Sequence, residues 1–280
     1  SLHELMGEAG ARLISGGTDL MLEVTQQYRD LPCLIDLSEV TELQRWSVDD
    51  DQVEIGAAVT YSSIEQDLCD RLGEMGRQLR ALLYRLGSRQ VRNVGTVGGN
   101  LANGSPIGDM PPMLMAMDAI IEITSIAGGR RTSAIETFYE GYRQTTLQPD
   151  EYIAMIRLPV SAFHDFHRFY KSSKRIEDDI SSVMGAFRFT GSNGEISGAR
   201  IAYGGMAATP VRLHEIEQLV LGKVDGALIT KAVSKIAEVM QPLSDVRASA
   251  DYRRAVAESM LERALREFGG EELPMVMEAM

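Results

Sequence analysis

The sequence is short of the residues that build several kinds of site. It has only two cysteines, Cys33 and Cys69, so it holds no CxxC framework for a metal ion or an iron–sulfur cluster. No stretch approaches the roughly 18 consecutive apolar residues of a membrane-spanning helix. A formal net charge of −12 leaves little positive charge for a nucleic-acid groove. We therefore expect no metal site in this chain, no membrane span and no nucleic acid as a partner.

Cysteine usage also bears on location. Few cysteines favour a reducing compartment, since small secreted domains often rely on disulfides. Residues 1–6 have neither the basic region nor the apolar core of a secretion signal. Together these features predict a cytoplasmic protein.

The first half of the chain alternates strand-like and helical patterns. Residues 53–58 are typical of a strand. A helix is predicted after Ser62, with Glu65 completing a capping box, and a second helix is predicted to end at Gly87. Residues 93–109 are rich in glycine and follow neither periodicity, so we expect a long loop there.

The second half has a different texture. Two strand-like segments, 183–190 and 195–203, flank a hairpin signal at residues 191–194, and three helical patterns follow. One hairpin followed by a helical run implies a small α+β domain. We predict an α+β fold with two domains, at residues 1–163 and 164–280.

Two glycine-rich loops carry the candidate chemistry. Loop one follows an apolar strand directly and consists of Ser15, Gly16, Gly17, Thr18, Asp19 and Leu20. Loop two spans 93–109 and contains Thr96, Gly98, Gly99 and Asn100. Successive backbone N–H groups in such turns form anion-binding nests without lysine or arginine. Two loops of this kind predict a site that binds the two phosphates of a dinucleotide.

Each double glycine alone is more often an ordinary tight turn. Neither loop fits the Rossmann pattern GxGxxG or the phosphate-loop pattern GxxxxGK[ST]. By spacing alone, the two loops therefore indicate only a phosphate-bearing ligand.

A resemblance makes the prediction more specific. The two loops resemble the FAD-binding module of the xanthine dehydrogenase family, the flavoprotein subunits of molybdenum hydroxylases. The likeness is closest to the small, FAD-carrying subunit of bacterial xanthine dehydrogenases and covers about residues 10–268. It continues through residues 55–60, 105–109, 141–144, 171–180 and 203–210. The resemblance implies a PCMH-type FAD-binding domain, followed by a domain like the C-terminal domain of carbon monoxide dehydrogenase flavoproteins.

The resemblance also assigns cofactor contacts. It implies that both loops hold the pyrophosphate and ribityl region of FAD, and that Asp109 contacts the adenosine end. It implies that Leu86 and Leu147 pack against the cofactor and that Lys171 reaches the flavin. By themselves, Asp109 suits a turn, the leucines suit an ordinary core, and Lys171 lies in a charged run typical of a solvated face.

No catalytic residue is expected, because FAD carries the redox chemistry. The resemblance implies that electrons come from a molybdenum cofactor through [2Fe–2S] clusters, all in partner domains or subunits, and pass on to NAD⁺ or another acceptor. Residues 1–5 resemble the family's first helix, and the resemblance implies that the FAD-binding domain is truncated before it. Two alternatives remain: a freestanding FAD-dependent oxidoreductase, and a scaffold that has lost FAD.

Overall fold

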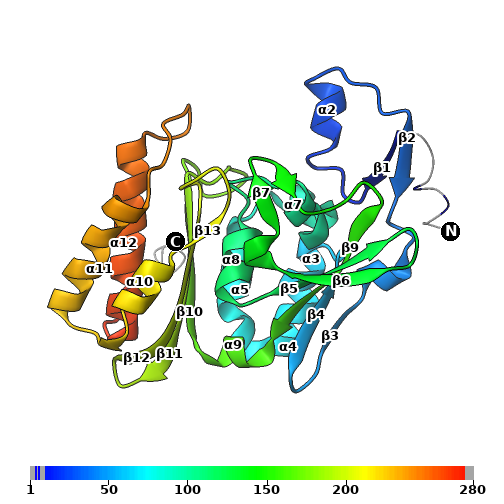
Figure 1. Ribbon diagram of the computed structural model, residues 1–280. Helices are drawn as coiled ribbons and strands as arrows, with labels where there is room; N and C mark the ends of the chain where they lie inside the picture. The colour runs from blue at the N-terminus through cyan, green and yellow to red at the C-terminus, as the bar shows by residue number, and fades with distance from the viewer. Residues whose placement is uncertain (1–3, 5, 7–9, 275–280) are drawn as a thin grey trace.

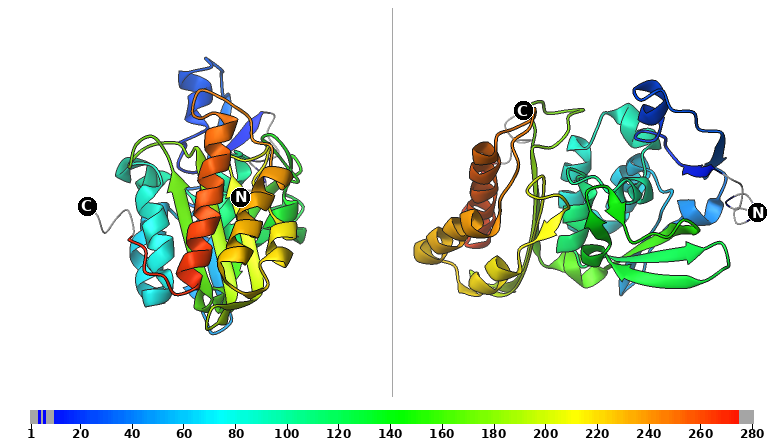
Figure 2. Two further views of the ribbon diagram at one scale, coloured as in Figure 1. Left: turned by 90° about the vertical axis from the view of Figure 1, so that its left-hand side faces the viewer. Right: turned by 45° about the horizontal axis from the view of Figure 1, so that its top comes forward.

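The computed structural model describes residues 4, 6 and 10–274. Its main architecture is two five-stranded sheets with helices between and beside them (Figure 1). The helices α5 and α8 lie between the sheets, and α10, α11 and α12 cover the outer face of the second sheet (Figures 1 and 2). This mixed, layered arrangement confirms the predicted α+β fold.

The first sheet is antiparallel. Its strand order is β3 (Trp46–Val48), β4 (Gln52–Gly56), β9 (Glu151–Pro159), β5 (Ile120–Ser125) and β6 (Arg130–Ala134). The helical segments of this half are α3 (Tyr61–Ser63), a π-helical turn at Ile64–Leu68, α4 (Cys69–Leu72), α5 (Arg77–Arg85), α6 (Arg89–Val94), α7 (Val97–Ala102), α8 (Met110–Ala116), α9 (Val160–His164), and 3₁₀ turns at Thr41–Gln44, Gly73–Gly76 and Ile135–Thr137. A large hydrophobic cluster joins these helices to the sheet.

Two predictions for this half are wrong in detail. The first helix is capped by Thr60, whose Oγ1 accepts a hydrogen bond from Ser63 N at 3.2 Å, and not by Ser62. Glu65 forms no capping box, because its carboxylate instead accepts a hydrogen bond from Arg92 Nε at 3.0 Å. The predicted loop 93–109 contains the end of α6 and all of α7, which begins after the capping residue Thr96.

The second sheet is also antiparallel. It comprises β10 (Phe166–Ser172), β11 (Val183–Ser192), β12 (Glu195–Gly204) and β13 (Val211–Arg212), with β14 (Gly222–Lys223) paired to β12. Asn193 and Gly194 both have positive φ in the β11–β12 turn, so the hairpin predicted at 191–194 is confirmed. The helices α10 (His214–Leu219), α11 (Gly226–Val239) and α12 (Ala250–Phe268) follow and share a second hydrophobic cluster with the sheet.

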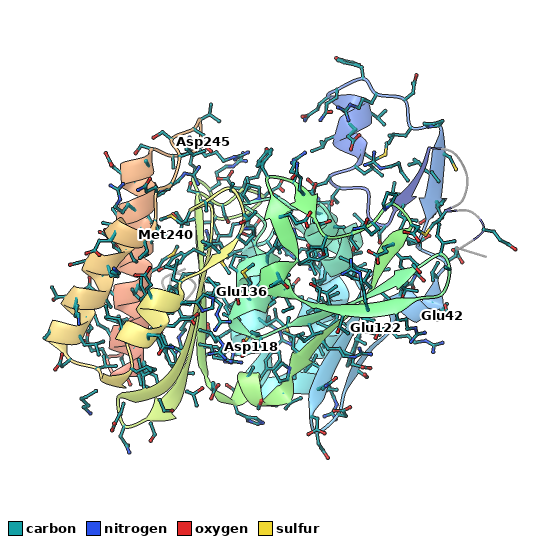
Figure 3. The ribbon with its side chains drawn as sticks, in the orientation of Figure 1. Glu42, Asp118, Glu122, Glu136, Met240 and Asp245 are labelled. Carbon is teal, nitrogen blue, oxygen red and sulfur yellow. The ribbon has the colours of Figure 1, made fainter. Side chains whose placement is uncertain are left out.

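Ion pairs join the two halves beside α8. Asp118, just after α8, accepts hydrogen bonds from Arg188 and from Arg200 Nε, the latter at 2.8 Å. Glu136 accepts a bond from Arg212 Nη1 at 3.0 Å. Figure 3 shows Asp118 and Glu136 along this seam between the two sheets. The seam fixes the second sheet against α8, so elements from both halves can line one cavity.

A small lobe stands apart from the layers (Figure 1). It consists of β1 (Ala11–Ile14), the parallel strand β2 (Cys33–Asp36) and α2 (Met21–Thr25). No residue of α2 is buried. A two-stranded hairpin of β7 (Tyr139–Gly141) and β8 (Gln144–Thr145) lies near α7. Over residues 4, 6 and 10–274, no helix is long and apolar enough to cross a membrane.

Candidate functional site

A cavity of about 730 Å³ lies where the lobe, α7 and the segment after β10 meet. That volume is within the range of small-molecule and cofactor sites. Most of the predicted site residues line it: Ser15, Gly16, Gly17, Thr18, Asp19, Leu20, Leu86, Thr96, Gly99, Asn100, Asp109 and Lys171. The fold thus brings both glycine loops and the distant lysine to one place.

Gly98 and Leu147 do not line this cavity. Gly98 packs against β4's end: its N–H donates to Ala57 O at 3.0 Å, and an added Cβ would lie 2.5 Å from Ala57 Cβ. Leu147 is partly buried against the core of the first half. In this structure both residues have packing roles, which explain their identity without a ligand.

Loop one is pressed against the chain that precedes α7. A Cβ added at Gly16 would lie 1.9 Å from Val94 O, so only glycine allows the two loops to approach this closely. Gly17 has φ +68°, a conformation that glycine adopts at little cost, and its carbonyl accepts Met21 N at 3.0 Å. These two glycines therefore set the turn from β1 into α2 and place loop one beside Thr96.

The glycines of loop two act differently from the prediction. Of the five between 93 and 109, only Gly104 has positive φ, so they do not form a run of left-handed turns. Instead Thr96 Oγ1 accepts Gly99 N at 3.1 Å and caps α7. A Cβ added at Gly99 would meet only Thr96 Oγ1, at 3.0 Å, so the space in front of Gly99 is open toward the cavity.

One buried polar atom of the cavity wall has no partner. Among the residues that the structure describes, Asn100 Oδ1 is buried and accepts no hydrogen bond, although Asn100 lines the cavity. A buried acceptor of this kind is costly unless a donor reaches it. Nearby, burial and then the Asp109 carboxylate raise the pKa of the Tyr61 phenol well above its ordinary value, so Tyr61 lines the wall as a neutral group.

Asp109 and Lys171 form one buried pair. Lys171 Nζ lies 2.6 Å from Asp109 Oδ2, and the two side chains are 2% and 8% exposed. Ser181 Oγ donates to the other carboxylate oxygen. Lys171 is therefore not on a solvated face. The resemblance assigns these two residues to opposite ends of FAD. In the structure they contact each other, and the Asp109 carboxylate balances the positive charge of Lys171.

Sequence reasoning missed several cavity residues. These are Arg12, Gln26, Gln27, Asn103, Arg143, Ile180 and Ser181. Residues 141–144 and 171–180 carried part of the family resemblance, but no role followed from it for Arg143 or Ile180. Their place in the wall depends on the β7–β8 turn and on the segment between β10 and β11, which no local pattern connects to the glycine loops.

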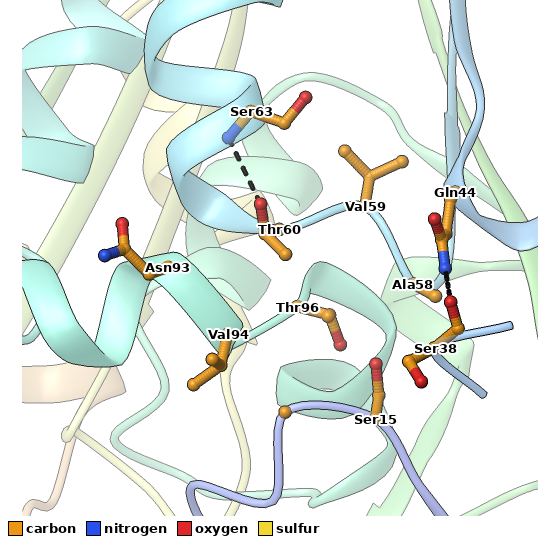
Figure 4. Close-up of a pocket in the computed structure, with 11 residues that line it drawn as sticks. Ser15, Ser38, Gln44, Ala58, Val59, Thr60, Ser63, Asn93, Val94 and Thr96 are labelled. Atoms are coloured by element: carbon orange, nitrogen blue, oxygen red, sulfur yellow. Dashed lines mark hydrogen bonds between the residues drawn. The ribbon is translucent and has the colours of Figure 1, made fainter. Parts of the chain in front are cut away.

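A second, smaller cavity of about 330 Å³ lies behind the contact between the two loops (Figure 4). It shares Ser15, Gly16 and Thr96 with the large cavity, and its lining includes no charged side chain. Several of its polar groups are already paired. Gln44 Nε2 donates to Ser38 O, and Ser63 N donates to Thr60 Oγ1. In addition, among residues 4, 6 and 10–274 there is no cluster of side chains able to hold a metal ion.

Known proteins match the chain along most of its length. A family model described as the FAD binding domain in molybdopterin dehydrogenase matches residues 1–161, and one described as the CO dehydrogenase flavoprotein C-terminal domain matches residues 168–268. The glyceraldehyde dehydrogenase medium chain of Sulfolobus acidocaldarius is 30% identical over 270 residues, covering 95% of this chain and 94% of that one. The xanthine dehydrogenase of Drosophila pseudoobscura pseudoobscura is 32% identical over 272 residues, but the match spans only 20% of its length.

Solved structures agree with these matches. A chain of reconstituted CO dehydrogenase from Oligotropha carboxidovorans superimposes with a TM-score of 0.89 at 28% identity, covering 97% of this chain and 94% of that one. A chain of quinoline 2-oxidoreductase from Pseudomonas putida 86 gives a TM-score of 0.87 at 27% identity, covering 96% and 94%. The similarity thus extends over both sheets and the lobe.

Proposed function

The chain belongs to the FAD-binding flavoprotein subunits of the molybdenum hydroxylase family, and from that premise we propose that it holds FAD in the large cavity and passes electrons to a soluble acceptor. The electrons come from [2Fe–2S] clusters and a molybdenum cofactor carried by partner domains or subunits. NAD⁺ is the acceptor that we put to the test first. We place the FAD-binding domain at residues 1–163 and the C-terminal domain at 164–280.

The observation that carries the proposal is the unpaired acceptor Asn100 Oδ1 beside the open face of Gly99. A ligand that donates a hydrogen bond and brings bulk close to the α7 backbone satisfies both features. FAD has hydroxyl and imide donors as well as a pyrophosphate, and the volume of the cavity suits a ligand of that size. The residues present therefore fit the cofactor.

Each part of the wall suits a different part of FAD. Loop one and the open face of Gly99 would allow the pyrophosphate to approach the backbone closely. The carboxylate of Asp19 suits ribose or ribityl hydroxyls, because it accepts hydrogen bonds from them. Leu86 and Ile180 supply apolar surface for the flavin ring.

When bound, FAD supplies the chemistry that exchanges a hydride or single electrons. The chain's own residues bind and orient the cofactor. The buried Asp109–Lys171 pair holds β10 against the start of α8 and keeps this part of the wall in place. No side chain of the cavity needs to act as an acid, base or nucleophile.

An absorption spectrum tests the proposal. The full chain is incubated with FAD, desalted and then treated with NADH under anaerobic conditions. We expect retained flavin bands near ~450 nm that NADH bleaches, because a reduced nicotinamide gives its hydride to a bound flavin. Retained flavin that NADH does not bleach would exclude NAD⁺ as acceptor and keep the FAD module. A folded sample that retains no flavin contradicts FAD binding by this chain alone.

A freestanding oxidoreductase predicts a different result. Such an enzyme would reduce its flavin from a small-molecule donor without any other subunit. Incubation of the FAD-loaded chain with purines and aldehydes, in the absence of NADH, separates the two cases. We expect no bleaching, because the site that oxidises the substrate lies in a partner.

A further inference from the structure

Three cationic side chains line the large cavity, and two of them already have partners. Arg12 Nη2 lies 3.1 Å from Glu23 Oε1, and Lys171 Nζ lies 2.6 Å from Asp109 Oδ2. Arg143 is exposed at the opening and has no hydrogen bond or ion pair with any described residue. Its guanidinium is therefore the cavity's one cation still available to a ligand, among the residues that the structure describes.

The backbone at Arg143 is strained. Tyr142 and Arg143 form the two-residue turn between Gly141 and Gln144, and Arg143 has φ +53°. At such a turn position glycine or asparagine is usual, because the Cβ of other residues crowds the backbone in this conformation. The comparable strain at Asp118 accompanies side-chain bonds to two arginines. Arg143 gains no such bond, so the structure gives no internal reason for an arginine here, and outliers of this kind point to function.

The turn is held at a fixed place on the wall. A Cβ added at Gly104, just after α7, would lie 3.0 Å from Arg143 Cα, so the turn packs directly on the end of that helix. Gly104 itself has φ +63°. Because the first turn of α7 faces the cavity, this contact sets the distance between the arginine and the glycine loops. The backbone that carries the guanidinium is therefore packed against the end of α7.

The side chains that line the cavity carry more negative than positive charge, so an anion needs a nearby cation to bind there. Against the three cations, the lining has five carboxylates: Asp19, Glu23, Asp109, Asp178 and Asp179. The chain as a whole carries −12. A phosphate entering this field is repelled unless a local cation receives it. Arginine suits that role, because its planar fork binds phosphate oxygens in pairs.

We propose that Arg143 is a phosphate-recognition residue, placed by the strained β7–β8 turn to receive the phosphate of a dinucleotide. The inference rests on the proposed function. The phosphate belongs either to the pyrophosphate of FAD or to a nicotinamide dinucleotide that approaches the bound flavin. The chemistry of recognition is the same in both cases.

Three substitutions and one control test the proposal in the full chain. Arg143→Gln removes the charge, Arg143→Lys keeps the charge without the fork, and Arg143→Gly also relieves the positive φ. The control is Arg71→Gln, since Arg71 is exposed in α4, does not line the cavity and has no side-chain bond to a described residue. Two titrations are compared: FAD into the flavin-free protein, followed by flavin fluorescence, and ADP-ribose into the FAD-loaded protein, followed by calorimetry.

We expect Arg143→Gln and Arg143→Gly to weaken one of the two ligands about tenfold, with a smaller loss in Arg143→Lys and none in Arg71→Gln. The affected affinity should also lose part of its dependence on salt. Because glycine tolerates the turn, Arg143→Gly should unfold at the same urea concentration as the wild type or a higher one, which excludes misfolding as the cause.

The ligand that weakens identifies the source of the phosphate. A change in FAD affinity assigns Arg143 to the cofactor, and a change in ADP-ribose affinity alone assigns it to the acceptor. Unchanged affinities for both ligands in Arg143→Gln would overturn the inference and leave the FAD site intact. A wild-type chain that binds no FAD would contradict the proposed function itself.

Discussion

Replacing Gly99 by valine tests the cofactor site most directly. A Cβ at this position meets only Thr96 Oγ1 at 3.0 Å, and the rest of a valine side chain would extend into the open cavity. The first turn of α7 would then be closed to a phosphate. Charge-assisted hydrogen bonds from backbone N–H groups contribute about 1.5–3 kcal/mol each. Gly98 N, Gly99 N and Asn100 N already donate to Ala57 O, Thr96 Oγ1 and Thr96 O. The substitution therefore removes one such bond, which corresponds to about 1.5–3 kcal/mol, or a roughly 10- to 10²-fold rise in the Kd for FAD.

The same substitution should leave folding almost unchanged. Valine is a better helix former than glycine by a few tenths of a kcal/mol, roughly offsetting the tight contact with Thr96. Retained flavin is measured by absorbance after desalting, and folding by thermal unfolding of the flavin-free protein. Gly226→Val at the start of α11 is the matched control, because an added Cβ there meets no atom within 4 Å. Full flavin occupancy in Gly99→Val would refute the assignment of α7 to the cofactor.

Three further predictions concern stability, each followed by urea unfolding. Asp109→Asn leaves the Lys171 ammonium buried without its counter-charge and should cost about 3–5 kcal/mol. Thr96→Ala removes the cap of α7 and should cost about 1 kcal/mol, whereas Thr96→Ser should cost less. Burial lowers the pKa of His167 below its unfolded value of about 6.5, so its contribution to stability is present above that pH and is lost as the pH falls through the folded-state pKa. His167→Gln should flatten that part of the pH profile.

Each of these predictions has its own check. The double variant Asp109→Asn/Lys171→Met should regain part of the lost stability, and an equal loss in single and double variants would show that the cost is not the unpaired lysine. Equal stability of Thr96→Ala and wild type would mean that the cap contributes nothing. A pH profile of His167→Gln that matches the wild type would assign the acid sensitivity to other groups.

The sequence alone indicated the class of fold and two glycine-rich segments that line the large cavity. The close spacing of glycines around residues 16 and 99 marks places where backbone must approach another group, and that requirement is local to the chain. The hairpin at 191–194 was predictable for the same reason, since its turn residues and the flanking strands are neighbours in sequence. The resemblance then supplied the cofactor.

The tertiary structure decided how those segments work. Within residues 93–109, α7 forms because Thr96 caps its first turn and Gly98 packs on Ala57, a partner 41 positions away that local periodicity does not reveal. Asp109 and Lys171 are 62 positions apart and form a pair only because β10 lies against the start of α8. Arg143 enters the cavity wall through a turn that packs on Gly104. Local sequence sets backbone freedom and periodicity, whereas the pairing of charges and the walls of a cavity depend on which distant elements the fold places together.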